Sequence, residues 1–220
     1  VEQRGAEQSL HVLVDRLNDL LLFTEPEGPG LSAYGAKSRE LLILACTEVE
    51  DAWMHYMRRA KVKASGQRYG TNQYVRLRDP LHLSEYEVSL AGYSKAPKVR
   101  AFQGWSGSKP TVSLPWYDAY NKAKHDRTAN LSMATLLRCI EAVAANLILF
   151  CVRFSPFPLY QQSTPIASLV NHLFTIELVN CDPATFYVPL VSPPATMRSD
   201  LVCGQMNDFV DPWNVKPLVL

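Results

Sequence analysis

The spacing of hydrophobic positions divides most of the chain into amphipathic helices. Apolar residues recur every three or four positions over residues 6–23, which predicts a helix, and the two Pro and two Gly residues of 25–30 end it. A second helical pattern covers residues 36–62. A third helix is predicted to begin at Pro115, because proline suits the first turn. Residues 131–154 are apolar almost all round, which is typical of the central helix of a bundle or of a helix in a dimer interface.

The segments between these helices carry weaker patterns. Residues 63–79 have the composition of a loop with some extended character. Ser84 and Glu87 have the spacing of a capping box, which predicts a short helix over residues 83–93. Residues 94–115 contain Gly and Pro at several positions and are predicted to form a loop.

The last part of the chain changes character. Apolar and polar residues alternate over residues 174–178, which predicts a strand, and residues 186–191 are a candidate for a second strand at a sheet edge. We therefore predict a mainly α protein in two parts. Residues 1–160 form a bundle of four to five helices, and residues 161–220 form a Pro-rich C-terminal extension with one or two strands.

Composition excludes several classes of protein. The chain has 220 residues, of which 47% are hydrophobic and 20% charged, as in ordinary globular proteins. Its five cysteines include no C-x-x-C pair, which favours reduced thiols and a cytoplasmic location over a disulfide framework or a zinc knuckle. The longest apolar run, 142–152, is interrupted by Asn146 and is too short to span a bilayer, so no membrane association is expected.

Charge is unevenly distributed along the chain. The net charge is only +1, yet residues 58–127 contain 14 Lys and Arg against 5 Asp and Glu. Such segregation indicates an anionic partner, of which RNA or another nucleic acid is the leading candidate. The densest part has seven basic residues, no acidic residue and two interleaved tyrosines, and its basic residues are the predicted nucleic-acid contacts: Arg58, Arg59, Lys61, Lys63, Arg68, Arg76 and Arg78.

Candidate chemistry concentrates in residues 114–127. This stretch places Asn121, Lys124, His125 and Arg127 within seven positions, behind three aromatic residues. In a helix, Tyr117, Asn121 and Lys124 share one face and His125 adjoins them. His125 is then a candidate general base, and Lys124 or Arg127 a candidate cation for an anionic substrate.

The order of these parts resembles that of the HEPN superfamily, the helical bundles found in nucleases, toxins and antiviral defence proteins. A long helix carries an acidic motif that includes Glu48 and Glu50, a basic middle follows, and the N-K-A-K-H sequence of residues 121–125 precedes an apolar helix. Nuclease members carry an Arg separated from the His by four to six residues. Here those positions hold Tyr120, Ala119 and Asp118, so the sequence resembles a variant pattern in which Asn121 replaces the Arg.

The resemblance implies binding or metal-independent cleavage of RNA, in a toxin or defence setting, with His125, Asn121, Lys124 and Arg127 at the catalytic site and with no cofactor or metal. It also implies a homodimer, in which two motifs share one cleft. The apolar face of residues 142–152, or the Pro-rich extension, is the predicted dimer contact.

Two alternatives remain open from the sequence. In the first, the protein is a non-catalytic helical module for dimerisation or interaction, and Asn121 and His125 satisfy buried backbone groups. In the second, Glu48, His55 and His125 belong to a metal-dependent hydrolase, although no second His or Cys stands at ligand spacing on the helix that carries Glu48.

Overall fold

The computed structural model describes residues 2–160, 164–179, 218 and 220. The described residues confirm a mainly α fold, with eight α-helices and one two-stranded sheet. The helices are α1 Glu2–Leu21, α2 Ala36–Arg59, α3 Thr71–Tyr74, α4 Pro115–His125, α5 Arg127–Asn130, α6 Leu136–Phe154, α7 Phe157–Tyr160 and α8 Pro165–Leu173. The strands are β1 Tyr86–Leu90 and β2 Phe174–Leu178.

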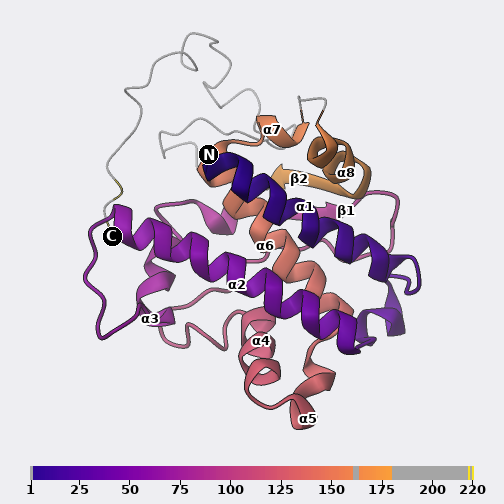
Figure 1. Ribbon diagram of the computed structural model, residues 1–220, viewed down its shortest axis with the longest axis horizontal. Helices are drawn as coiled ribbons and strands as arrows, with labels where there is room; N and C mark the ends of the chain where they lie inside the picture. The colour runs from indigo at the N-terminus through magenta and orange to yellow at the C-terminus, as the bar shows by residue number, and fades with distance from the viewer. Residues whose placement is uncertain (1, 161–163, 180–217, 219) are drawn as a thin grey trace.

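Helix α6 is the centre of the bundle, as its apolar pattern predicts. It packs against α1, α2 and α4, and α1 and α2 lie side by side in front of it in Figure 1. Thr135 caps its N-terminus, because the Thr135 side chain accepts a hydrogen bond from the Arg138 backbone N–H at 3.3 Å. Every residue from Ala142 to Cys151 is buried.

The burial of α6 corrects the predicted dimer contact. Residues 142–152 were expected to leave apolar surface that a second copy would cover, but the chain's own helices bury residues 142–151. The other predicted contact, the Pro-rich extension, lies largely outside the described residues. The large exposed hydrophobic side chains lie elsewhere among the described residues: Leu22, Phe23, Tyr34 and Val112 are each more than half exposed. No described helix is both long enough and apolar enough to cross a membrane.

The sheet joins two parts of the chain that are far apart in sequence. β1 pairs antiparallel with β2, with Tyr86 opposite Leu178 and Leu90 opposite Phe174. The strand at 174–178 is confirmed, whereas the helix predicted over residues 83–93 is wrong: a single 3₁₀ turn, Leu83–Glu85, leads directly into β1. Side chains at alternate positions of β1 are buried, so tertiary pairing overrides the local capping-box pattern.

The described part of the extension packs on the bundle. α8 lies against α1, and β2 completes the sheet with β1. The second predicted strand, residues 186–191, lies outside the described residues. The segment 63–79 also differs from prediction, because residues 71–77 form α3 and a 3₁₀ turn rather than extended chain.

An aromatic cluster fills the core between α2, α4 and the loop that precedes α4. Trp53 of α2 is completely buried at its centre and stacks on Trp105, with ring centroids 4.8 Å apart. The rings of Tyr74 and Tyr117 lie 5.2 and 5.3 Å from Trp53. This cluster fixes α4 against α2, and it thereby positions the residues in which the candidate chemistry concentrates.

Candidate functional site

Helix α4 forms because Pro115 opens it and its buried positions recur at helical spacing. Trp116 anchors the first turn by donating a hydrogen bond from its indole N–H to the Ala101 carbonyl at 3.0 Å. Arg39 of α2 donates from Nε to the Ala123 carbonyl at 3.0 Å. That carbonyl belongs to the last turn, whose oxygens lack partners within the helix, so Arg39 stabilises the C-terminal end of α4.

A second hydrogen bond joins α2 to the first turn of α4. The Tyr117 hydroxyl donates to Glu50 Oε1 of α2 at 2.6 Å. Burial and this hydrogen bond raise the pKa of Tyr117, so the phenol keeps its proton at physiological pH. The sequence singled out Glu50 and Tyr117 separately but did not pair them. The sequence gives only a weak indication of this pairing, because the two residues are 67 positions apart.

Tyr117→Phe tests this contact. The substitution keeps the ring and removes the donor, which leaves the half-buried Glu50 carboxylate without this partner. We expect the free energy of unfolding to fall by about 1–3 kcal/mol, measured by urea denaturation. Tyr34→Phe is the matched control: the Tyr34 side chain is exposed, so its change should stay within about 0.5 kcal/mol. Equal stability of Tyr117→Phe and wild type would show that the bond contributes nothing.

The predicted catalytic residues surround the C-terminal end of α4. His125 is the last residue of the helix, is exposed, and its imidazole makes no hydrogen bond to a described residue. Lys124 is also exposed, and its Nζ donates to the Tyr120 hydroxyl at 2.8 Å and lies 5.0 Å from the centre of that ring. That hydrogen bond raises the pKa of Lys124, so its ammonium group stays charged at neutral pH.

The other two predicted residues are placed differently. Asn121 is half-buried, and its side-chain amide donates to the Tyr117 carbonyl of its own helix at 2.9 Å. Arg127 is the first residue of α5, and its side chain lies outside the described atoms. The structure therefore brings a free imidazole and a charged ammonium group to one exposed helix end, with Asn121 one turn behind.

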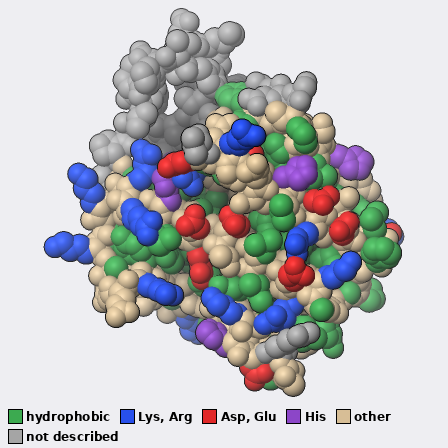
Figure 2. Space-filling view, viewed as in Figure 1, with side chains coloured by type: hydrophobic (Ala, Val, Ile, Leu, Met, Phe, Trp, Pro, Cys, Tyr) green, Lys and Arg blue, Asp and Glu red, His purple; other side chains and the backbone are tan. Residues whose placement is uncertain are grey.

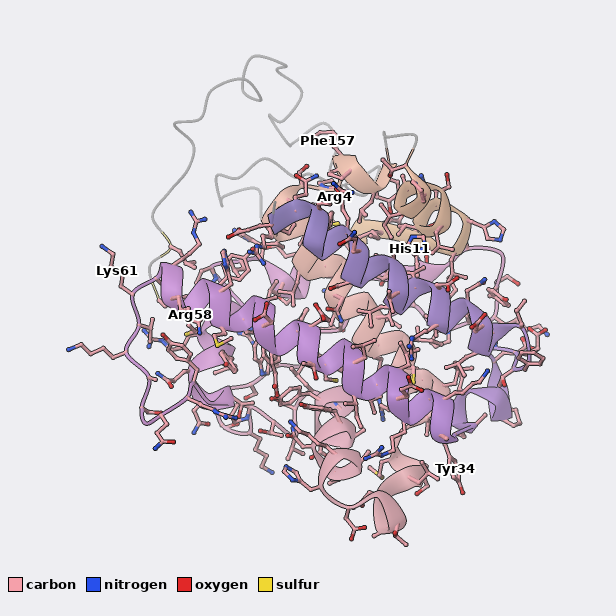
Figure 3. All side chains as sticks on the ribbon, viewed as in Figure 1. Arg4, His11, Tyr34, Arg58, Lys61 and Phe157 are labelled. Atoms are coloured by element: carbon pink, nitrogen blue, oxygen red, sulfur yellow. The ribbon has the colours of Figure 1, made fainter. Side chains whose placement is uncertain are left out.

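The predicted basic contacts form one continuous surface segment. Six of the seven side chains are exposed, along the C-terminal end of α2 and the chain that follows it: Arg58, Arg59, Lys61, Lys63, Arg68 and Arg76. Figure 2 shows basic side chains gathered over this end of the molecule, and Lys61 points away from the bundle in Figure 3. We call these six residues the basic segment.

Arg78 and the two interleaved tyrosines have structural partners instead. Arg78 is half-buried, forms an ion pair with Asp79 at 2.7 Å and donates to the Trp105 carbonyl. Tyr74 is buried against Trp53, and the Tyr69 hydroxyl donates to the Val62 carbonyl at 2.9 Å. These tyrosines hold the loop to α2 and are not free to stack on bases.

Helix α4 and the loop that carries the basic segment pack on the same side chain of α2. Tyr74 of α3, which follows this loop, lies against Trp53 with ring centroids 5.2 Å apart. Tyr117 of α4 lies against the same Trp53 ring at 5.3 Å. The loop and α4 are therefore held to the same part of α2.

The metal alternative receives no geometric support in the described part of the chain. No cluster there brings together three His, Cys, Asp or Glu side chains that could hold a metal ion. His55 instead faces Arg153, whose guanidinium donates to His55 Nδ1 at 3.1 Å. Burial and this guanidinium lower the pKa of His55, so the imidazole is neutral at physiological pH.

No protein-family model matches the chain, and no curated protein or solved structure is significantly similar to it.

Proposed function

We propose that this is an HEPN-like protein that binds RNA along the basic segment and presents His125 to the bound strand. The observation that carries the proposal is a set of six exposed basic side chains at the end of α2 and in a loop that packs, like α4, on Trp53; α4 presents exposed Lys124 and His125 at its own end. Lys and Arg side chains bind nucleic acid mainly through phosphates, and this term depends little on sequence. The resemblance of residues 121–125 to the HEPN motif favours RNA over DNA.

The proposal includes cleavage of the bound RNA without a metal, with His125 as the base and Lys124 as the cation. His125 takes the proton of a ribose 2′-hydroxyl, whose oxygen attacks the adjacent phosphorus. Lys124 neutralises the charge that develops on the phosphoryl oxygens. The bond to the 5′-oxygen breaks, that oxygen takes up a proton from a general acid, and the products are a 2′,3′-cyclic phosphate and a 5′-hydroxyl.

The variant His125→Ala distinguishes a catalytic role of the His125 side chain from a purely structural one. We expect the variant to lose cleavage of single-stranded RNA in EDTA, while RNA affinity changes less than threefold. Because His125 is exposed and has no described hydrogen-bond partner, its free energy of unfolding should change by less than about 1 kcal/mol. His172→Ala, at another exposed histidine, is the control for both measurements.

Two results would favour the non-catalytic alternative. One is no cleavage by the wild-type protein, and the other is cleavage by His125→Ala at the wild-type rate, which would show that the cleavage does not come from the proposed site. The bond from Asn121 to its own helix and the bond from Arg39 to Ala123 are the contacts that such a scaffold role would use. Asn121→Ala should then lower the melting temperature without changing any reaction.

A second copy of the chain would bring a second His125 and a second basic segment to the same RNA. We include this homodimer in the proposal, with its contact away from the buried face of α6. Multi-angle light scattering at micromolar concentration, with and without RNA, should give twice the 24.7 kDa mass of one chain. A mass of one chain under both conditions would contradict the proposed dimer but would not bear on the proposed RNA binding.

A further inference from the structure

A groove opens where α1, α2 and α6 meet, and the proposed RNA site does not use its central part. Its volume is about 470 Å³, within the range of small-molecule sites. Small residues keep it open, namely Gly5, Ala6 and Ser9 of α1 and Ala52 of α2. A Cβ atom placed on Gly5 would meet nothing within 4 Å, so this wall leaves room for a ligand.

Asn146 lines the groove with a fixed orientation. It is one of two buried polar side chains of the described core, with 9% of its surface exposed. Its Nδ2 donates to the Ala45 carbonyl at 2.9 Å and to the Ala142 carbonyl at 2.8 Å. Flipping the amide would set its oxygen against two carbonyls, so the orientation is unambiguous. Oδ1 accepts no hydrogen bond from a described residue, and it is the polar atom left to face the groove.

Two carboxylates add further hydrogen-bond acceptors to the lining of the groove. Glu48 stands one helical turn beyond Ala45, whose carbonyl binds Asn146, and Asp51 follows one turn later on the same face. Neither carboxylate has a hydrogen-bond or ion-pair partner within the described residues. Acidic side chains are visible over the middle of α2 in Figure 2. This half of the groove offers only acceptors, so it suits a positively charged donor.

The opposite half of the groove offers donors. Because Arg153 can only donate, His55 Nδ1 accepts its hydrogen bond and the proton of the neutral ring is on Nε2. Arg153 is also paired with Glu2 at 3.0 Å. The guanidinium of Arg58, seven residues after Asp51 and about 10 Å further along α2, has no hydrogen-bond or ion-pair partner among the described residues. Buried Leu10, Leu13 and Leu149 also line the groove.

We propose that this groove binds a small organic zwitterion, with an ammonium group at Glu48, Asp51 and Asn146 and a carboxylate or phosphate at Arg58 and His55. An apolar or methylene segment joins the two charged groups over the leucine side chains. A divalent cation needs several oxygen ligands around a single point, and no cluster of three His, Cys, Asp or Glu side chains among the described residues supplies them. The inference does not depend on RNA binding or cleavage.

Isothermal titration calorimetry with ω-amino carboxylates tests the site. The series 4-aminobutanoate, 6-aminohexanoate and 8-aminooctanoate varies the separation of the charges, and hexylamine and hexanoate each lack one charged end. We expect one zwitterion of the series to bind at least about tenfold more tightly than either single-ended analogue, since charge-assisted hydrogen bonds form at both ends. Double substitution of Glu48→Gln and Asp51→Asn should weaken that binding by about tenfold or more.

Control variants keep the test specific. Asp15→Asn with Asp19→Asn removes two exposed carboxylates of α1 outside the groove and should leave binding unchanged. Gly5→Phe fills the groove and should abolish binding without lowering the melting temperature. The inference is overturned if no zwitterion binds, if hexylamine binds as tightly as the best zwitterion, or if Mg²⁺ or Ca²⁺ titrates Glu48 and Asp51 in place of the amines.

Discussion

Replacing both Arg58 and Arg59 with Glu is expected to weaken RNA binding by roughly 100-fold at low salt. Both side chains are exposed at the C-terminal end of α2, where the basic segment begins. The substitution removes two phosphate contacts and places two negative charges beside the backbone of the RNA. The remaining affinity should also depend less on salt. For a single-stranded RNA, the slope of log K against log salt should become less negative by about 1.4. Fluorescence anisotropy with a labelled single-stranded RNA measures both quantities.

The control for this prediction carries the same change in net charge. Arg4→Glu with Lys37→Glu reverses two exposed basic residues outside the basic segment, one near the start of α1 and one in the first turn of α2. Figure 3 shows Arg4 on α1 and Arg58 near the end of α2. We expect less than a threefold loss of affinity for this pair. Equal losses in the two double variants would mean that RNA responds only to overall charge and that the basic segment is no binding site.

Trp53→Ala is expected to reduce the free energy of unfolding by about 3–5 kcal/mol. The ring is completely buried at the centre of the aromatic cluster, and it contacts rings from α4, α3 and the loop before α4. Removing it leaves a large cavity between α2 and α4. Domains are typically stable by about 5–15 kcal/mol, so the variant should unfold at much lower urea concentration or fail to accumulate.

Two milder substitutions, Trp53→Phe and Trp116→Phe, test the aromatic cluster even where Trp53→Ala fails to accumulate. The indole N–H of Trp53 has no hydrogen-bond acceptor among the described residues, whereas that of Trp116 donates to the Ala101 carbonyl. Trp53→Phe should therefore cost less than Trp116→Phe, which also leaves a buried carbonyl without its donor, by about 1–3 kcal/mol. The reverse order in urea denaturation would contradict the role assigned to these two side chains.

The long helices could be predicted from the sequence because their signals are local. The apolar periodicity of α1, α2 and α6 and the proline that opens α4 each depend on neighbouring residues. β1 could not be predicted in this way. Its partner β2 lies more than 80 residues further on, and the capping-box spacing of Ser84 and Glu87 pointed to a helix.

The candidate site also has a part that local sequence predicts and a part that depends on contacts between distant residues. The exposure of the basic residues followed from their density in the sequence, and six of the seven side chains are exposed in the structure. The tertiary partners of Arg78 and Tyr74 could not be predicted, because the Trp105 carbonyl and the Trp53 ring meet them only after folding. The same holds for Asn146, which interrupts an apolar run in the sequence and binds the Ala45 carbonyl of another helix in the structure.

The salt dependence of RNA binding by the wild-type protein tests the central claim most directly. If the basic segment and Lys124 contact phosphates, four to seven contacts should give a slope of log K against log salt between about −3 and −5 for single-stranded RNA. Anisotropy titrations from low to physiological salt with one labelled RNA measure this slope. A slope near zero, or no binding at the lowest salt, would contradict the proposal that this surface binds RNA.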